Sequence, residues 1–190
     1  MEIYISFDIE TDGPVPGLYS MLSLGCVAYT KLEGGGYHEI SCWTRNLSPL
    51  KGGGQHPDTM HWWLQFPKTF EKVCKDRISP ERAMYELDLW CHELKSHWKS
   101  RHLIPVAGPI GFDFTFVNWY AWKFTGRGPF LDSHNGLDLR SLAMPLYKCE
   151  YRAKNPVRDM QVTNPEPHIA INDAREQGEI LCALLKKAGI

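Results

Sequence analysis

The first residues of the chain alternate between apolar and mainly polar side chains. Residues 2–10 place Ile or Phe at the odd positions, while Asp8 and Glu10 fall at even ones. Successive side chains of a strand point to opposite faces, so this alternation predicts a β-strand with one apolar face. Asp8 and Glu10 then share the other face of that strand.

Two further strands are predicted directly after the first. Gly and Pro residues in 12–17 break the first strand, and residues 22–30 are again rich in apolar side chains. Three consecutive glycines at 34–36 then form a turn before a third apolar-rich segment, residues 37–47. Strands joined by such short connections are typical of an antiparallel meander.

Helical spacing follows a loop over residues 48–57. A short helix is expected to carry Trp62 and Trp63, which cannot both face the same core. We interpret the pair as core or capping aromatics, with one tryptophan covering a groove as the alternative. A longer helix is predicted to begin at Ser79-Pro80, a strong start signal. Its apolar positions recur at steps of three or four residues: Ala83, Leu87, Cys91, Leu94 and Trp98.

The second half of the chain alternates strands with helices. Residues 103–107 read as a short buried strand, and a helix is predicted from Asp113 to Phe124. Residues 137–139 fit an edge strand, residues 147–167 look irregular, and a last helix begins near Asn172-Asp173. This order predicts an α/β fold with a mixed central sheet and helices packed on it.

Length and composition indicate one globular domain over residues 1–190. The chain is 43% hydrophobic and 23% charged, with a formal net charge of −1, so no overall basic charge marks it as a nucleic-acid coat protein. It has no apolar run near the ~20 residues of a membrane span and no signal-like N-terminus. Six scattered cysteines without a Cys-x-x-Cys pair are expected to be reduced thiols, which favours a cytoplasmic location.

The candidate chemistry starts from Asp8 and Glu10. Two carboxylates on one face of an apolar strand repel each other and are costly to bury, and a hard divalent cation removes both problems. A solvated edge strand is the simpler alternative. Asp113 and Asp173 both fall at predicted helix starts, where acids also serve as caps. His168 precedes Asp173 by five residues.

Taken together, these residues resemble the DEDD superfamily of 3′–5′ exonucleases, in its histidine-containing DEDDh branch. The first motif stands as Asp8-Ile9-Glu10-Thr11, the second as Gly111-Phe112-Asp113-Phe114, and the third runs from His168 to Asp173-Ala174. The resemblance covers almost the whole chain, in the order expected for the family. Within this superfamily, the chain is similar to ribonuclease T, to polymerase proofreading subunits and to small bacterial and phage exoribonucleases.

The resemblance implies a ribonuclease H-like fold and a metal-dependent 3′–5′ exonuclease. Its substrates would be single-stranded RNA or DNA 3′ ends, and its products nucleoside 5′-monophosphates. The implied metal ligands are Asp8, Glu10, Asp113 and Asp173, which would hold two divalent cations, Mg²⁺ or Mn²⁺, with Asp8 bridging them. His168 is implied as the general base, because imidazole accepts protons near neutral pH. Its loop, with Pro165 and Pro167, is expected to close over the substrate.

Substrate contacts are expected on either side of the acids. Thr11 would contact the terminal 3′-hydroxyl, and the loop residues Leu18, Tyr19 and Met21 would stack on the last bases. Ordinary local packing is the alternative for these loop residues. A basic segment could track phosphates, with a solvated basic loop as its alternative. Its residues are Lys148, Arg152, Lys154 and Arg158.

Two features of the sequence bear on the substrate. Many family members carry His-Asn shortly before the second motif, where this chain has Gly108-Pro109. A pattern at Thr59, Trp62, Trp63 and Gln65 is similar to a stretch of small exoribonucleases and slightly favours RNA over DNA.

Two other functions remain open at this point. An RNase H-like endonuclease would use similar acids, and a catalytically silent nucleic-acid-binding domain would share the fold. The intact set of four acids and His168 favours the exonuclease over both. The resemblance also allows a homodimer.

Overall fold

A five-stranded mixed sheet in the order β3-β2-β1-β4-β5 forms the centre of the computed structural model, which describes residues 2–128, 131, 134–151, 160 and 162–190. The meander consists of β1 (Ile3–Thr11), β2 (Met21–Lys31) and β3 (Tyr37–Asn46), paired antiparallel. β4 (Leu103–Ala107) and the short β5 (Leu137–Asp138) run parallel to β1.

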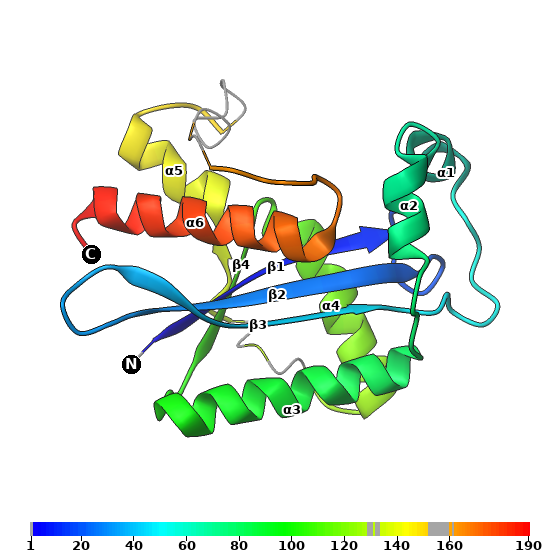
Figure 1. The fold of residues 1–190 in the computed structure, drawn as a ribbon, viewed down its shortest axis with the longest axis horizontal. Coiled ribbons are helices and arrows are strands. Elements are labelled where there is room, and N and C mark those ends of the chain that lie inside the picture. The colour runs from blue at the N-terminus through cyan, green and yellow to red at the C-terminus, as the bar shows by residue number, and fades with distance from the viewer. Residues whose placement is uncertain (1, 129–130, 132–133, 152–159, 161) are drawn as a thin grey trace.

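Helices cover both faces of the sheet and one of its ends. α3 (Pro80–Trp98) and α4 (Ile110–Thr125) pack on one face, and α5 (Leu139–Tyr147) and α6 (Ala170–Ala188) on the other. α1 (Pro57–Trp63) and α2 (Pro67–Val73) stand at the end toward which β1 points, near the start of α6 (Figure 1). The predicted fold class, a mixed sheet in an α/β arrangement, is confirmed. None of the helices in the described part of the chain is long and apolar enough to cross a membrane.

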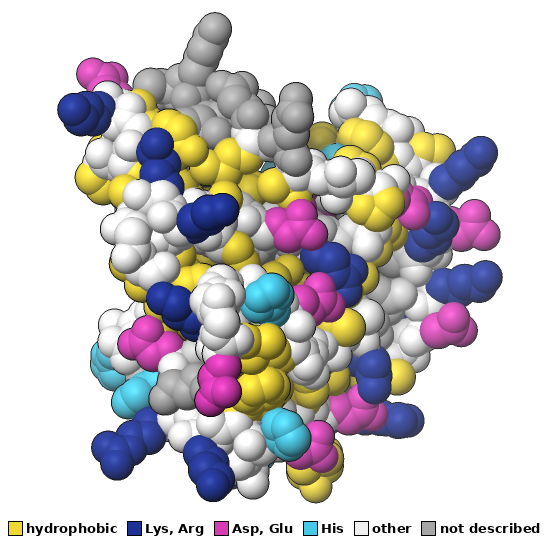
Figure 2. Space-filling model, turned by 60° about the vertical axis from the view of Figure 1, so that its left-hand side comes forward, with side chains coloured by type: hydrophobic (Ala, Val, Ile, Leu, Met, Phe, Trp, Pro, Cys, Tyr) yellow, Lys and Arg dark blue, Asp and Glu magenta, His cyan; other side chains and the backbone are white. Residues whose placement is uncertain are grey.

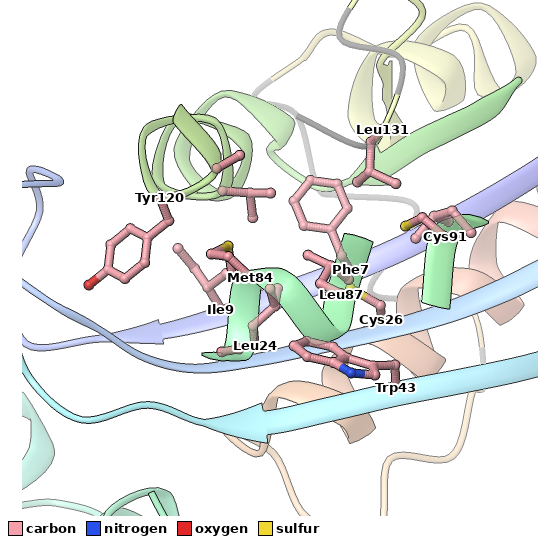
Figure 3. Close-up of a cluster of buried hydrophobic side chains, with 14 of the residues drawn as sticks. Phe7, Ile9, Leu24, Cys26, Trp43, Met84, Leu87, Cys91, Tyr120 and Leu131 are labelled. Atoms are coloured by element: carbon pink, nitrogen blue, oxygen red, sulfur yellow. The ribbon is translucent and has the colours of Figure 1, made fainter. Parts of the chain in front are cut away.

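The larger core lies between the sheet and α3 and α4. The odd positions of β1 enter it as predicted, and Phe7 is completely buried. Figure 3 shows Phe7 and Ile9 facing Met84 and Leu87 of α3, with Tyr120 of α4 beside them. Each such side chain contributes about 1.5–3 kcal/mol on burial, so this face holds the sheet rigid beneath the acids on the opposite face.

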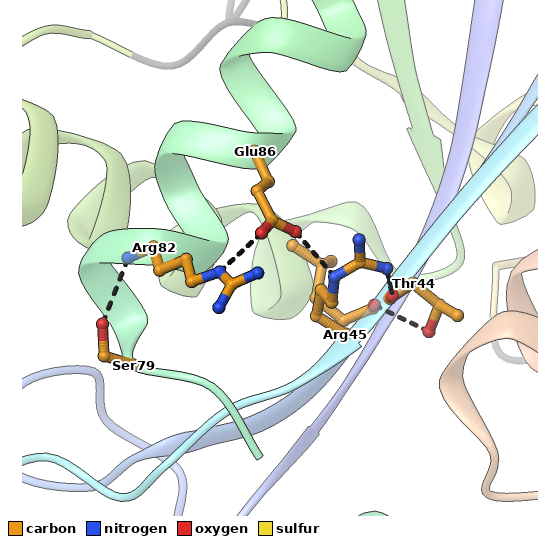
Figure 4. A network of polar contacts seen from close by, with 6 residues as sticks. Thr44, Arg45, Ser79, Arg82 and Glu86 are labelled. Atoms are coloured by element: carbon orange, nitrogen blue, oxygen red, sulfur yellow. Dashed lines mark hydrogen bonds and ion pairs between the residues drawn. The ribbon is translucent and has the colours of Figure 1, made fainter. Parts of the chain in front are cut away.

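The start of α3 is fixed to β3 by polar contacts (Figure 4). The Ser79 hydroxyl caps the helix by accepting a hydrogen bond from the Arg82 backbone N–H at 3.2 Å, as the sequence predicted. Glu86 accepts hydrogen bonds from both Arg82 and Arg45, each at 2.7 Å. Exposed ion pairs contribute only about 0–1 kcal/mol each, so this network orients α3 more than it stabilises the fold.

Two helices were missed by the sequence analysis. The predicted helix around Trp62 and Trp63 ends at Trp63, and a second helix, α2, begins at Pro67, a residue that lacks the N–H needed to continue a helix. The predicted edge strand stops at Asp138, whose carboxylate accepts a hydrogen bond from the Ser141 N–H at 2.7 Å and caps α5.

Three predicted boundaries were also wrong. α4 begins at Ile110, three residues before the predicted start at Asp113. The last helix begins at Ala170, two residues earlier than expected. Met21 is the first residue of β2 and is fully buried in the larger core, so it does not belong to the preceding loop. A side chain in that position has no access to a nucleic-acid base, and the predicted base contact of Met21 is wrong.

Two glycines let α6 lie unusually close to the sheet. A Cβ atom on Gly25 of β2 would lie 2.4 Å from the backbone nitrogen of Ile171, at the start of α6. A Cβ atom on Gly178, farther along α6, would lie 2.1 Å from the ring of Tyr29 on β2. Real Cβ atoms do not approach other atoms so closely, so α6 takes this position only because both residues are glycine.

We expect Gly25→Ala to push the start of α6 away from the sheet and to lower the free energy of unfolding by ~1–3 kcal/mol, the usual range for overpacking. Urea denaturation measures this loss. Gly111→Ala is the matched control, because a Cβ there meets open space and the residue is not at positive φ. Equal stability of the two variants would contradict the close approach.

Candidate active site

Asp8 and Glu10 project from the end of β1 toward α6. In the ladder with β2, Asp8 lies opposite Gly25 and Glu10 opposite Ser23, and the register shifts immediately afterwards, between Glu10 and Thr11. Glu10 is only 7% exposed. Because Gly25 has no side chain, the start of α6 comes in directly beside the two carboxylates.

Asp113 reaches the same place from the opposite side of β1. It lies in the first turn of α4, is 6% exposed, and its Oδ1 accepts a hydrogen bond from the backbone N–H of Ile9 at 3.2 Å. Ile9 is the residue between Asp8 and Glu10. The carboxylate of Asp113 therefore joins α4 to β1 and does not cap its own helix.

Asp173 joins the cluster from the first turn of α6. Its Oδ2 accepts a hydrogen bond from the His168 backbone N–H at 2.9 Å, and its Oδ1 accepts one from the Asn164 side chain at 2.6 Å. The Asn164 amide also donates to Glu176, one turn farther along α6, at 2.7 Å. Asp173 thus stabilises the loop before its helix, as a capping residue would, and also faces the other acids.

The side chain of His168 is held between aromatic rings of α1 and of the turn after it. Its imidazole lies 4.8 Å from the Trp62 ring and 4.6 Å from the Phe66 ring, measured between centroids. The backbone of His168 has φ 66°, a left-handed conformation that a non-glycine residue rarely adopts. Glu166, two residues earlier, pairs with Lys72 of α2 at 2.6 Å. These contacts hold His168 and Glu166 against α1 and α2 in this structure. The closure of their loop over a substrate stays a prediction.

Burial raises the pKa of all four carboxyl groups, and the charges of other acids in the cluster raise it further at Asp8, Glu10 and Asp113. Burial is the largest cause of the raised pKa of Asp8, followed by the charges of Asp113, Glu10 and Asp173. Burial likewise raises the pKa of Glu10, with Asp173 and Asp113 adding to it. Burial raises the pKa of Asp113 to about 7, and it also raises the pKa of Asp173.

This donor set fits hard divalent cations. Among the described residues, none of the four carboxylates forms an ion pair with Lys or Arg, so their charges are left to repel one another. Ligand atoms of Glu10, His168 and Asp173 lie within 4.8 Å of one another, close enough to surround one ion. Carboxylate oxygens suit Mg²⁺ and Mn²⁺, and cations at this position would neutralise the cluster.

The residues predicted to contact the substrate differ in their exposure to solvent. The carbonyl of Thr11 accepts a hydrogen bond from the Trp63 indole N–H at 2.9 Å, and Thr11 itself is 8% exposed. Leu18 is 64% exposed at the tip of the loop between β1 and β2. Tyr19 is half-buried and packs against the ring of His56. Arg152 and Lys154 lie outside the described residues.

Several residues of the site were not predicted as such. Gln177 of α6 donates a hydrogen bond from Nε2 to Asp8 Oδ1 at 3.0 Å. Its spacing of four residues from Asp173 places both on one helix face, a signal present in the sequence. The contacts of Trp62 and Asn164 depend on loop conformations and had no comparable signal.

In this α/β fold, Asp8, Glu10, Asp113 and Asp173 converge from three elements with a histidine beside them, an arrangement that resembles the DEDD nucleases. No protein-family model matches the chain. A relative in Escherichia coli named 3′-5′ DNA exonuclease Cap18 is 29% identical over 184 residues, which cover 94% of this chain and 89% of the relative.

Solved structures with the same fold are also nucleases of this kind. The nuclease domain of 3′hExo, a DEDDh family member bound to rAMP, has a TM-score of 0.65 at 9% identity, over 97% of this chain and 91% of that domain. S. pombe Pop2p in its Mg²⁺- and Mn²⁺-bound form has a TM-score of 0.62 at 13% identity, and the match covers 95% of this chain and 82% of the Pop2p chain. E. coli Exonuclease I in complex with a dT13 oligonucleotide has a TM-score of 0.65 at 12% identity, and the match covers 98% of this chain and 41% of the Exonuclease I chain.

These comparisons confirm the resemblance stated from the sequence motifs. The chain is similar over nearly its full length to a named 3′–5′ exonuclease, and it shares its fold with DEDD nucleases. The prediction of a hydrolytic 3′–5′ exonuclease is therefore confirmed at the level of the enzyme class.

We expect the metal-free protein to lose stability as the pH rises from about 4 to about 7. In that range folded Asp113 keeps its proton, whereas an ordinary aspartate in the unfolded chain, with a pKa near 3.9, has lost it. The contribution of this proton to the free energy of unfolding is therefore complete below about pH 4 and is lost between about pH 4 and pH 7. In EDTA, the melting temperature at pH 8 should lie at least ~2–4 °C below that at pH 5.5, which corresponds to about 1 kcal/mol for a domain of this size.

Asp113→Asn is the control for this pH dependence. In EDTA the variant should be more stable than the wild type at pH 8, and the difference should shrink at pH 5.5. A wild-type melting temperature that does not fall toward pH 8 would contradict the mutual repulsion of the acids.

Proposed function

We propose that the protein is a metal-dependent 3′–5′ exonuclease that removes nucleoside 5′-monophosphates from the 3′ ends of single-stranded DNA. The observation that carries this proposal is the convergence of four carboxylates, without any basic partner among the described residues, next to a histidine held by its own aromatic contacts. The relative from E. coli is named a DNA exonuclease, and related folds have been solved with a single-stranded oligonucleotide and with a nucleoside monophosphate.

The four acids act as the metal ligands in this proposal. Asp8, at the centre of the cluster, would be shared between two Mg²⁺ or Mn²⁺ ions. Glu10 and Asp173 would complete one site, and Asp113 would contribute to the other. When bound, such a pair of cations activates water and stabilises the charge on the phosphate and the leaving oxygen. The support for this assignment is that burial raises the pKa of all four carboxyl groups, and that the charges of the other acids add to it at Asp8, Glu10 and Asp113.

His168 acts as the general base. Its imidazole would take a proton from the attacking water, whose oxygen forms the new bond to phosphorus while the bond to the 3′-oxygen of the preceding nucleotide breaks. The leaving 3′-oxygen takes up a proton from solvent, and the terminal nucleotide departs as a 5′-monophosphate. Trp62 and Phe66 hold the imidazole by packing, so its position does not depend on a metal bond.

DNA replaces RNA as the preferred substrate in this proposal. The weak preference for RNA came from the pattern around Trp62 and Trp63, but both side chains have contacts inside the protein. Trp62 packs on His168, and Trp63 is 2% exposed with its indole N–H bonded to Thr11. The pattern therefore carries no information about the sugar, whereas the name of the E. coli relative specifies DNA.

The loop after β1 offers the nearest surface for the last bases. Exposed Leu18 and half-buried Tyr19 would stack on them, a contact worth ~1–3 kcal/mol per base without sequence preference. The side of the molecule away from α1 and α2 shows basic and acidic side chains interspersed, with no continuous basic surface among the described residues (Figure 2). The phosphates of the substrate are therefore expected near β1, α1 and α6.

The remaining predictions belong to the same proposal. A single domain over residues 1–190 acts in the cytoplasm, and the six free cysteines of the structure fit a reducing compartment. A homodimer stays a prediction, for which the oligomeric state in solution is the test.

The direction of degradation is tested with single-stranded DNA labelled at its 5′ end. We expect a ladder that shortens from the 3′ end, release of 5′-mononucleotides, and a block by a 3′-phosphate. A matched RNA oligomer measures the sugar preference. Efficient cutting of circular single strands would instead indicate an endonuclease, and binding without any cleavage would indicate a silent binding domain.

Activity is expected to require Mg²⁺ or Mn²⁺ and to disappear in EDTA. Asp8→Asn should abolish cleavage and weaken Mn²⁺ binding measured by calorimetry, while circular dichroism shows an intact fold, because the substitution removes a ligand charge without changing the volume. Full activity in excess EDTA would refute the metal dependence. Full activity of the variant would refute the assignment of Asp8.

His168→Ala should lower kcat by ~10²–10⁴-fold, the usual range for a lost general base, and leave Mn²⁺ binding nearly unchanged. Asp173→Ala is the comparison, because loss of a ligand should reduce both. If His168→Ala weakens Mn²⁺ binding as strongly as Asp173→Ala, the histidine is a metal ligand, consistent with its position near Glu10, and its role as base is wrong.

A further inference from the structure

We infer that Gln177 is a positioning residue that fixes the orientation of the Asp8 carboxylate for metal binding. Its side-chain amide lies between two parts of the site. Oε1 accepts a hydrogen bond from the backbone N–H of Gly108 at 2.7 Å, and Nε2 donates one to Asp8 Oδ1 at 3.0 Å. This inference rests on the proposed function.

The bond to Gly108 determines which way the amide of Gln177 points. A backbone N–H is only a donor, so it must face the carbonyl oxygen of the side chain, which leaves the NH₂ group for Asp8. A carboxylate accepts but does not donate, so the reversed amide would present an oxygen to Asp8 and a donor to Gly108. Both bonds would be lost together in that orientation.

Gln177 also joins three separate segments at one point. It lies on α6, one turn after Asp173, while Gly108 is the first residue after β4 and Asp8 belongs to β1. Gly108 and Pro109 have no polar side chains, so at this turn the polar contact is supplied from α6. Gln177 therefore links the turn at Gly108 to Asp8 by hydrogen bonds on both sides of its amide.

A neutral amide suits this position better than a cationic side chain. A lysine or arginine would neutralise Asp8 and compete with the cations, whereas an amide N–H binds one oxygen and leaves the negative charge in place. With Oδ1 held by Gln177, the carboxylate of Asp8 has a fixed orientation. Residues that orient a metal ligand in this way commonly change metal affinity or activity by ~10–100-fold when they are removed.

The test is Gln177→Met, which keeps the length and approximate volume of the side chain but removes both hydrogen bonds. We expect Mn²⁺ binding, measured by calorimetry without DNA, to weaken at least tenfold. The Mn²⁺ concentration for half-maximal cleavage should rise to a similar extent. At saturating Mn²⁺, the KM for single-stranded DNA should stay within about twofold of the wild type, because Gln177 contacts Asp8 and not the substrate.

Arg175→Met is the matched control on the same helix. Arg175 forms an ion pair with Glu39 at 2.9 Å and has no contact with the acids. Its loss should leave Mn²⁺ binding unchanged. Gln177→Leu is a second variant that removes both hydrogen bonds, and thermal unfolding of all three variants shows whether each one folds.

The outcomes separate this inference from the function on which it rests. A wild-type protein that binds Mn²⁺ and degrades DNA, together with a Gln177→Met variant of wild-type Mn²⁺ affinity, would overturn the inference alone. A wild-type protein that neither binds Mn²⁺ nor degrades DNA would overturn the proposed function and this inference with it. Loss of cooperative unfolding in both Gln177 variants would make Gln177 a residue of the fold and not a positioning residue.

Discussion

The site depends on how closely α6 lies against β2. Gly25 and Gly178 remove the two side chains that would hold the helix away, and the first turn of α6 therefore reaches the acids of β1. Asp173 and Gln177 both belong to this helix, and they reach the acids of β1 only because the helix lies so close to β2. The larger core on the other face of the sheet keeps β1 fixed while α6 approaches, so the packing of one face supports the chemistry of the other.

The acids brought together in this way destabilise one another in the absence of metal. Neutral hydrogen-bond donors bind three of these carboxylates. The backbone N–H of Ile9 donates to Asp113, and that of His168 donates to Asp173. The side-chain amide of Gln177 donates to Asp8. Each donor orients a carboxylate without cancelling its charge. The arrangement sacrifices stability above neutral pH, and it leaves a concentrated negative charge that hard cations can neutralise.

The imidazole of His168 is held by side chains other than the four acids. Trp62 and Phe66 pack against its ring, and Lys72 holds the same loop through Glu166. The helices α1 and α2 that carry these residues are anchored beneath by Trp63, which is buried and bonded to β1 through its indole N–H. Contacts of His168 and of the acids therefore lead back to the same strand, β1, although these residues come from segments far apart in the sequence.

The sequence by itself determined the strands, the long helices and the identity of the four acids and His168. Alternation and helical spacing are local properties, and the motifs name their residues directly. The tertiary structure alone decided the rest. Met21 looked like a loop residue because burial depends on packing and not on its neighbours in the chain. The bond of Gln177 to Gly108 had no sequence signal, because the two residues lie 69 positions apart. Contacts between distant segments leave no periodic pattern, so they become visible only when the fold brings those segments together.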